Sequence, residues 1–359
     1  MDASTRASRQ RRSSRPTISD VAARAGVDRA VVSKVLSEDP SLRVRDETRE
    51  RVRRAASDLG YRPNFHARSL ARSRAGALGL LMPQGNPLFA EVMAGAEDVA
   101  TERDLLLWTA THDGHLAERH RRLLQGGVVD ALLVTGLDAD VDAHDLFAAT
   151  RVPVMLVNRR SKGSDRWVIL DDARAAEVAT RHLVDLGHAT IAFLGGPRDV
   201  DTAERRADGY RSAMAAAGLR VDPSLVVRAA YTPAAGDAAV HALLHGPVRP
   251  TAIVAADAPL GLGAWHALEA LGLRVPGDVS LIAIHRPPLE EFRVPALSCV
   301  ELPLRKLGRR AAELVLDSSP EEPIHETVRD GIVLFEGSTV ARPRPSTTGR
   351  RRQVNRLTR

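Results

Sequence analysis

Gly26 constrains the N-terminal part of this chain more than any other residue, because it separates two short helical patterns. Thr17 and Asp20 form an approximate capping box at the start of the first pattern. Asp28 is placed to cap the second pattern, and a third pattern extends over residues 46–59 with an arginine-rich outer face. Three short helices with a glycine-containing tight turn between the first two form a helix-turn-helix arrangement.

The part of the chain after residue 76 has a different pattern, in which short apolar runs alternate with longer amphipathic stretches. The apolar runs predict strands at 78–82, 105–108, 131–134, 154–157, 191–194, 252–255 and 280–284. The amphipathic stretches predict helices at 89–103, 173–186, 203–217 and 263–271. Alternation of this kind favours parallel α/β sheets with helices on both faces. A length of roughly 265 residues favours two lobes over one.

Charge is distributed unevenly along the chain. Residues 1–74 contain 18 Lys and Arg against 9 Asp and Glu, whereas residues 342–359 contain 7 Arg and no acidic residue. The segment between them is acidic, with 26 basic and 36 acidic residues. A basic head on an acidic body indicates that only the head approaches a polyanion such as DNA. For the arginine-rich C-terminal end, a solubilising tail is an equally good interpretation.

Several classes of chemistry are disfavoured. Cys299 is the single cysteine, so an internal disulfide is impossible and a reducing, cytoplasmic location is expected. The 12 histidines are scattered without zinc-type spacing, and we therefore predict no metal site and no cofactor. No apolar run approaches the ~18–20 residues that cross a bilayer, and the Arg/Ser-rich N-terminus lacks the apolar core of a secretory signal.

Runs of residues in a fixed order resemble the lactose-repressor (LacI/GalR) family of transcriptional regulators. The family's helix-turn-helix pattern, T-I-x-D-V-A-x-x-A-G-V-S-x-x-T-V-S-R-V-L-N, is similar to TISDVAARAGVDRAVVSKVLS, and its third helix and hinge resemble ETRERVRRAASDLGYRPNFHARSL. Its periplasmic-binding-protein-like body resembles the later runs NPLFAEVMAGAEDVA, RHLVDLGHATIAFLGG, PTAIVAAD, ALGLRVPGDVSLIA and LGRRAAEL. The resemblance covers residues 16–342. It implies an α/β protein with an N-terminal all-α helix-turn-helix head and a two-lobed body built on parallel sheets.

The expected organisation has five segments. Disordered basic tails are expected at 1–15 and 343–359. The resemblance implies a helix-turn-helix DNA-binding domain at 16–62 and a hinge at 63–75. It also implies an effector-binding and dimerisation domain of two lobes at 76–342.

The resemblance places the DNA contacts of the head around the second helix, whose N-terminal end enters the major groove in this motif. Arg29, Ala30 and Lys34 occupy the base-reading positions, and Arg and Lys side chains both suit guanine O6 and N7. The family usually has Thr and Arg where this chain has Val31 and Lys34, which alters one phosphate contact and the operator sequence. A solvated helix face is the alternative for the two basic residues. The predicted DNA-binding set is Thr17, Asp28, Arg29, Ala30, Val31, Ser33, Lys34, Asn64, Arg68 and Leu70.

Leu70 is the hinge residue with the most specific implied role. In the family the hinge becomes helical on operator DNA, and the aligned leucine enters the central base step from the minor groove. Inserted apolar side chains of this kind kink the duplex. The hinge therefore implies a palindromic operator read by a homodimer.

The body is expected to bind a small-molecule effector between its lobes. The resemblance implies ligand contacts from Phe89, Arg159 and Arg206. Asp257 and His285 stand where an Asn and an Asp are usual, and packing is an equally open interpretation for both. The two arginines and the histidine would make part of the cleft positive if they converge, which favours an anionic or strongly polar ligand such as a sugar acid or sugar phosphate. A pocket that no longer senses a ligand is the alternative.

The expected function is therefore a sequence-specific transcriptional regulator of double-stranded operator DNA, with repression favoured by the resemblance, controlled by a sugar-like or anionic effector. A solute-binding protein without DNA function is one alternative, but the basic head disfavours it. An enzyme is another, although no G-x-x-x-x-G-K-[ST], H-E-x-x-H or G-x-S-x-G motif is present and no catalytic residue is predicted.

Overall fold

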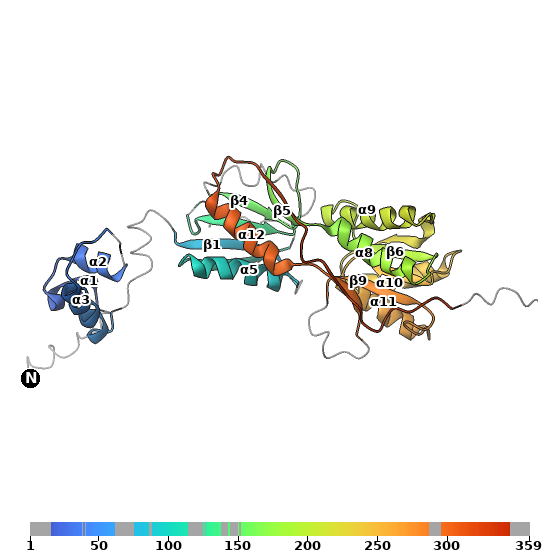
Figure 1. Cartoon of the computed structure of the whole chain (residues 1–359), viewed down its shortest axis with the longest axis horizontal. Helices are drawn as coiled ribbons and strands as arrows, with labels where there is room; N and C mark the ends of the chain where they lie inside the picture. Colours follow the sequence, from blue (N-terminus) through green and yellow to red (C-terminus); the bar gives the residue numbers. More distant parts are fainter. Residues whose placement is uncertain are drawn as a thin grey trace, which may run out of the picture. The chain divides into compact units, whose positions relative to one another are not determined.

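The computed structural model describes residues 16–37, 39, 41–61, 75–85, 88–113, 125, 127–137, 143, 150, 152–286 and 296–344. The chain divides into two compact units, residues 1–75 and residues 76–359, and each is described by itself (Figure 1). The N-terminal tail predicted at 1–15, hinge residues 63–74 and residues 345–359 of the C-terminal tail lie outside the described residues.

The N-terminal unit contains the three predicted helices, α1 (Ile18–Ala25), α2 (Arg29–Leu36) and α3 (Asp46–Asp58). Thr17 and Asp20 form the predicted capping box at α1, and the side chain of Asp28 caps α2. Gly26 ends α1 in the left-handed conformation, with φ 64°, which glycine adopts without steric penalty. The inner faces of the three helices form one small core of Val21, Ala22, Ala25, Val32, Val35, Val52, Ala55 and Ala56.

The second unit contains two six-stranded sheets, which confirms the predicted two-lobed α/β body. Sheet A has the order β11-β5-β4-β3-β1-β2 and is parallel throughout. Its strands are β1 (Ala77–Pro83), β2 (Leu106–His112), β3 (Ala131–Thr135), β4 (Val154–Val157), β5 (Arg166–Leu170) and β11 (Ile324–Val328). Helices α5 (Phe89–Glu102) and α12 (Leu304–Asp317) pack against it.

Sheet B has the order β12-β10-β9-β8-β6-β7, and only β12 is antiparallel to its neighbour. Its strands are β6 (Ile191–Gly195), β7 (Val226–Arg228), β8 (Ala252–Ala255), β9 (Ser280–Ile284), β10 (Ser298–Glu301) and β12 (Val333–Phe335). Helices α8 (Asp172–Asp185) and α9 (Asp201–Ala216) pack on this sheet, as do α10 (Pro233–His245) and α11 (Ala258–Ala270), and a short 3-10 turn, Pro223–Leu225, precedes β7.

Several elements differ from the sequence expectation. The sequence did not predict β11 and β12, which form one edge of sheet A and of sheet B, respectively. Strand β11 has a polar composition and β12 has only three residues. Strands β5, β7 and β10 and helices α10 and α12 were not assigned either. Helix α11 begins at Ala258 instead of Gly263, because Asp257 caps it and Pro259 is favoured in a first helical turn.

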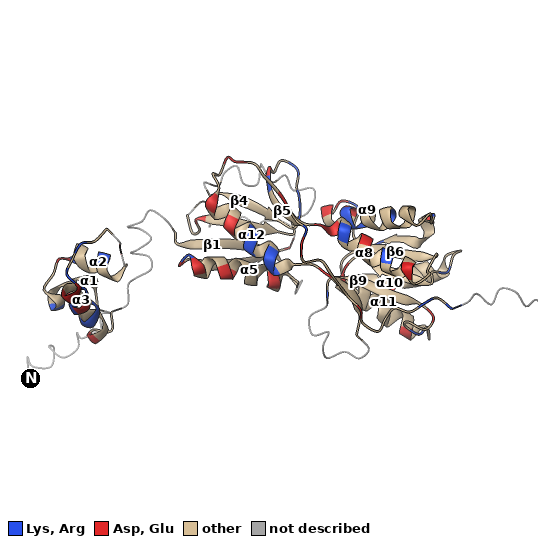
Figure 2. Cartoon of the chain, viewed as in Figure 1, with Lys and Arg blue, Asp and Glu red and all other residues tan. Residues whose placement is uncertain are grey.

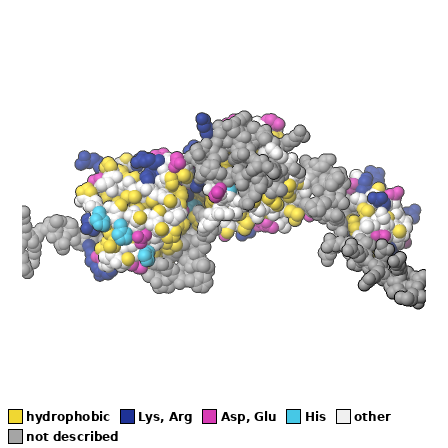
Figure 3. Space-filling model, turned by 180° about the vertical axis from the view of Figure 1, so that it is seen from behind, with side chains coloured by type: hydrophobic (Ala, Val, Ile, Leu, Met, Phe, Trp, Pro, Cys, Tyr) yellow, Lys and Arg dark blue, Asp and Glu magenta, His cyan; other side chains and the backbone are white. Residues whose placement is uncertain are grey.

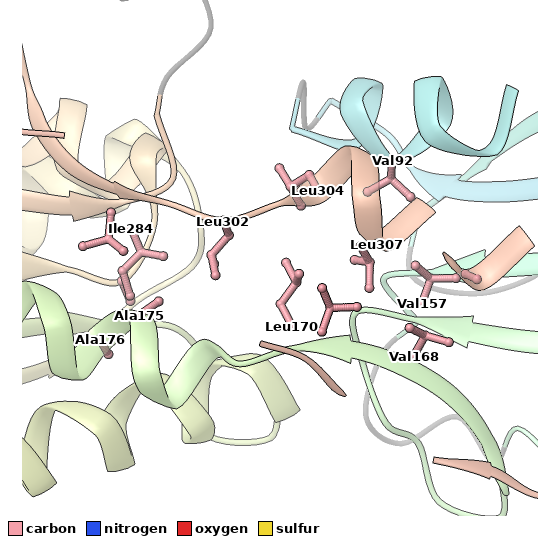
Figure 4. Packing of buried hydrophobic residues seen from close by; sticks show 14 of the residues in the cluster. Val92, Val157, Val168, Leu170, Ala175, Ala176, Ile284, Leu302, Leu304 and Leu307 are labelled. Carbon is pink, nitrogen blue, oxygen red and sulfur yellow. The ribbon is translucent and has the colours of Figure 1, made fainter. Parts of the chain in front are cut away.

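One apolar cluster extends through both lobes. It includes Leu133 of sheet A and Phe193 of sheet B, and the chain segment leading from β10 into α12 contributes Leu302 and Leu304 (Figure 4). Leu302 is 7% exposed and packs in this cluster. The lobes are therefore joined by apolar burial as well as by covalent crossovers.

Helices α5 and α12 approach each other closely at two glycines. A Cβ atom added to Gly308 would lie 2.0 Å from the carbonyl oxygen of Val92, and one added to Gly95 would lie 1.9 Å from that of Arg305. Ion pairs border this contact, with acidic residues of α5 facing basic residues of α12 (Figure 2). Among the described residues, no helix is long and apolar enough to span a membrane.

Candidate functional site

Helix α2 presents an exposed polar face. Arg29, Ala30, Ser33 and Lys34 are all exposed, and their spacing places them on one side of the helix. Asp28 accepts a hydrogen bond from the Ala30 backbone N–H at 3.1 Å, so its carboxylate is engaged in capping the helix. The exposed face is thus held by local capping and by the small core beneath it, and it offers a guanidinium, a hydroxyl and an ammonium group.

The other predicted DNA contacts are placed differently. Val31 is only partly exposed and packs against the core of the N-terminal unit. Thr17 is exposed and caps α1. The predicted hinge contacts Asn64, Arg68 and Leu70 lie outside the described residues.

The second candidate site is a small cavity between the lobes, with a volume of about 40 Å³. All five predicted effector residues line it, which is a convergence that the sequence could not show. The lining residues are Leu88, Phe89, Gly136, Asn158, Arg159, Thr202, Arg206, Tyr231, Asp257, His285 and Leu304.

The ends of parallel strands build this cavity. Asn158 follows β4, Asp257 follows β8 and His285 follows β9. Carboxyl ends of parallel strands are where ligands bind in open α/β sheets. Asn158 and His285 both adopt φ 67°, in the left-handed region that residues other than glycine rarely adopt. Such backbone strain concentrates at functional sites.

Arg206 is the centre of a buried hydrogen-bond network. Its Nε atom donates to Asp172 Oδ1 at 2.7 Å and its Nη1 atom donates to the Ala256 carbonyl at 2.6 Å. Its Nη2 atom donates to Nε2 of His285 at 2.9 Å. The arginine is 3% exposed, the aspartate 0% and the histidine 4%. All three hydrogen bonds of the guanidinium are therefore made within the protein.

Arg205 extends this network to the sheet A lobe. It forms an ion pair with Asp172 and donates to the backbone carbonyls of Leu170 at 2.6 Å and Asn158 at 3.1 Å. Asp201, at the start of α9, bonds both Arg205 and Arg160, the latter from the loop after β4. The cavity therefore lies beside a chain of charged contacts between the lobes.

The charge states follow from this burial. Burial alone would raise the pKa of Asp172, but Arg205 and Arg206 outweigh it and keep that pKa below its usual value. Burial, aided by Arg206, lowers the pKa of His285 to about 3. Burial raises the pKa of Asp257 to about 6, against the opposing effect of the Leu260 N–H and Arg206. The histidine is therefore neutral at pH 7.

Of the three groups expected to make the cleft positive, His285 does not contribute a charge and Arg206 is held in an ion pair. His285 carries no charge because its pKa is lowered to about 3, and Arg206 is ion-paired with Asp172, a carboxylate that it shares with Arg205. Arg159 donates to the Leu137 carbonyl at 3.1 Å. Sequence reasoning missed Asp172, although an Asp–Asp pair directly after a strand end was a signal that could have indicated it.

Three polar atoms of lining residues are buried without a hydrogen-bond partner among the described residues: Nδ1 of His285, Oδ1 of Asn158 and the hydroxyl oxygen of Tyr231. An arginine can only donate, so Nε2 of His285 accepts, and the proton of the neutral ring is on Nδ1. This Nδ1 atom and Oδ1 of Asn158 are both buried and have no hydrogen-bond partner among the described residues. Because unpaired buried polar groups are destabilising, this pair points to an incoming ligand that accepts from one and donates to the other.

Known proteins are similar to this chain in both of its units. Residues 17–64 match the model of bacterial regulatory proteins of the lacI family, and residues 180–340 match that of a periplasmic binding protein-like domain. The chain is 33% identical over 337 residues to the HTH-type transcriptional regulator CelR of Thermobifida fusca, covering 90% of this chain and 98% of that one. It is 35% identical over 302 residues to the HTH-type transcriptional regulator AscG of Escherichia coli K12, covering 81% and 88%.

Solved structures agree in fold. The complex of the transcriptional regulator CelR with cellobiose aligns with a TM-score of 0.69 and 30% identity, covering 90% of this chain and all of that one. The lac repressor dimer bound to operator and the anti-inducer ONPF aligns with a TM-score of 0.78 over 91% of this chain. At 24% identity, this alignment shows only that the two proteins share a fold.

Proposed function

The chain belongs to the LacI family of bacterial regulatory proteins, and from this membership we propose that it represses transcription by binding operator DNA under the control of a small polar ligand. The exposed face of α2 supports the DNA-binding part, because Arg29, Ser33 and Lys34 lie together where a recognition helix reads base edges and phosphates. The hinge residue Leu70 would add the minor-groove contact.

The unpartnered polar atoms of His285 and Asn158 carry the ligand-binding part of the proposal. His285 offers a buried N–H donor and Asn158 a buried acceptor, and both belong to residues that line the same cavity. A hydroxyl group can accept from one and donate to the other. Because His285 is neutral and Arg206 is ion-paired with Asp172, we favour a neutral polyhydroxylated ligand over a sugar acid or sugar phosphate. The cellobiose complex of the relative CelR supports a carbohydrate.

The cavity must enlarge to admit such a ligand. A volume of about 40 Å³ is far below the ~300–1,000 Å³ of most small-molecule sites. The lobes are held by contacts such as those of Arg160 with Asp201, which is 2.7 Å away. We propose that opening of the lobes admits the ligand and that this movement changes the affinity for DNA.

We also propose that the working unit is a cytoplasmic homodimer, because a single helix-turn-helix head covers too few base pairs for genomic specificity and a two-fold dimer reads a palindrome. Sedimentation at micromolar concentration tests this part. A monomer that still binds its operator specifically would contradict it.

A footprint across genomic fragments is the experiment that tests the proposed function. We expect protection of short palindromes that persists in the presence of excess nonspecific DNA. A solute-binding protein would give only weak association that salt abolishes. Thermal-shift screening of neutral sugars against sugar acids and phosphates then tests the ligand class. Stabilisation by anions alone would contradict the neutral-ligand proposal.

A further inference from the structure

Histidine side chains lie together on the surface of the sheet B lobe (Figure 3). Helix α10 contributes His241 and His245 together with Asp237, and helix α11 contributes His266. His266 and His245 are exposed, and His241 is half-buried. None of these residues lines the cavity or belongs to the exposed face of α2, so the proposed function leaves this face without a role.

The spacing of the two α10 histidines suits metal binding. His241 and His245 are four residues apart, and residues at this separation are neighbours on one face of a helix. In metalloproteases a pair of histidines at this spacing on a helix supplies two of the three protein ligands of the zinc ion.

The orientation of both rings leaves the correct nitrogen available. Nδ1 of His241 lies 3.0 Å from the Asp237 carbonyl oxygen, and Nδ1 of His245 lies 2.6 Å from the His241 carbonyl oxygen. A carbonyl oxygen only accepts, so each Nδ1 carries a proton that it donates, and each Nε2 of the neutral ring has a free lone pair. Neither Nε2 atom makes a hydrogen bond or ion pair among the described residues. Metal-binding histidines have this arrangement, with the second ring nitrogen donating to a carbonyl or carboxylate.

Asp237 adds a negative charge beside the pair. Its Oδ1 atom lies 3.4 Å from Nδ1 of His241, and its Oδ2 atom lies 2.9 Å from Nδ1 of His266. This carboxylate orients two rings and offsets part of the charge of a nearby cation. As placed, no group of three or more His, Cys, Asp or Glu residues in the described part of the chain could hold a metal ion, so the site must be a two-ligand one.

We propose that His241 and His245 bind one divalent transition-metal ion through their Nε2 atoms, with water in the remaining positions. Imidazole ligands select zinc, copper or nickel over magnesium or calcium. Zn–N bonds of about 2.0–2.1 Å require the two rings to tilt toward each other, which their exposure to solvent allows. This proposal departs from the sequence prediction of no metal site, which rested on the absence of Cys/His clusters.

Calorimetric titration of the tag-free, full-length protein with zinc chloride tests the proposal. We expect saturable binding of one ion per chain at the pair. His241→Asn and His245→Asn should each weaken it by on the order of tenfold or more, and Asp237→Asn by a smaller factor. His325→Gln is the matched control, because His325 is an exposed histidine that stacks on Trp167 and should leave binding unchanged.

A second measurement separates metal binding from damage to the fold. Zinc should raise the midpoint of thermal unfolding of the wild type and of His325→Gln, because an ion that binds only the folded state stabilises it. The His241→Asn and His245→Asn variants should unfold at the wild-type temperature without zinc and show a reduced response with it. Wild-type zinc affinity in both variants, or no saturable binding by the wild type, would overturn the proposal. Neither outcome bears on the DNA-binding function.

Discussion

Arg206 donates a hydrogen bond from Nη2 to Nε2 of His285, 2.9 Å away, and both side chains are buried. This one contact determines the chemistry that the histidine offers to the cavity. Because the arginine can only donate, the histidine must keep its proton on Nδ1 and act as a hydrogen-bond donor. An Asp, which the family resemblance suggests at this position, would be an acceptor instead. At this position the cavity therefore offers a hydrogen-bond donor in place of an acceptor.

The first prediction concerns pH and unfolding. The pKa of His285 is lowered from 6.5 to about 3, so the folded state binds fewer protons than the unfolded chain between those values, and stability falls as pH drops below about 6.5. The pKa of Asp257 is raised from 3.8 to about 6, which has the opposite effect, since its stabilisation is lost as pH rises through about 6. The two effects oppose each other between about pH 4 and 6.

Asp257→Asn removes the second effect while keeping a side-chain oxygen that can cap α11. We expect the free energy of unfolding of this variant to decline more steeply than that of the wild type between about pH 6 and pH 4. The difference should approach ~1.4 kcal/mol per pH unit, the value for one proton. Urea unfolding at a series of pH values measures it, with Asp208→Asn on the exposed side of α9 as the control. If the free energy of unfolding depended on pH identically in Asp257→Asn and the wild type, the raised pKa of Asp257 would be contradicted.

The second prediction concerns the buried ion pair. Arg206→Ala leaves the Asp172 carboxylate with Arg205 as its remaining partner and removes the donor to His285. Loss of one partner of a buried pair is strongly destabilising, so we expect a decrease of ~3–5 kcal/mol in the free energy of unfolding. Arg211→Ala, which removes an exposed ion pair from the same helix, should change it by ~0–1 kcal/mol. Equal effects in urea unfolding would show that the buried network adds nothing.

The third prediction concerns base reading by α2. Arg29→Ala should reduce discrimination at one operator position by ~1–3 kcal/mol, because a bidentate contact to guanine would be lost. Arg24→Ala is the control, since Arg24 is exposed on α1 and forms an ion pair with Asp58 at 3.5 Å. Fluorescence anisotropy with the operator and its single-base variants measures both. If Arg29→Ala weakened binding to all sequences equally, the residue would be a phosphate contact instead.

The fourth prediction concerns the close contact of α5 and α12. Gly308→Ala would place a methyl group 2.0 Å from the Val92 carbonyl oxygen, so the helices must separate. Overpacking of this kind destabilises by typically ~1–3 kcal/mol or more. Gly246→Ala, where the nearest atom would be 3.1 Å away, should have a smaller effect. A thermal unfolding midpoint for Gly308→Ala equal to that of Gly246→Ala would contradict the prediction.

Local chemistry made much of the fold predictable from the sequence. The capping box of Thr17 and Asp20, the cap at Asp28 and the left-handed Gly26 all depend on residues within a few positions of each other. Buried strands such as β3 and β6 were recognisable because their burial requires continuous apolar runs. Strands β11 and β12 escaped prediction, because β11 takes its place by pairing with the distant β5, and β12 is three residues paired to β10.

The sequence by itself determined the helix-turn-helix head and the α/β class of the body, and its family resemblance named candidate effector residues. Only the tertiary structure decided what those residues do to one another. Asp172 and Arg206 are 34 positions apart and Arg206 and His285 are 79 apart, so no local pattern relates them. Three properties depend on burial and on distances between distant segments: the neutral state of His285, the ion pair of Arg206 with Asp172 and the size of the cavity. A pKa responds to solvent exclusion and neighbouring charge in three dimensions, and neither quantity is encoded in the order of residues alone.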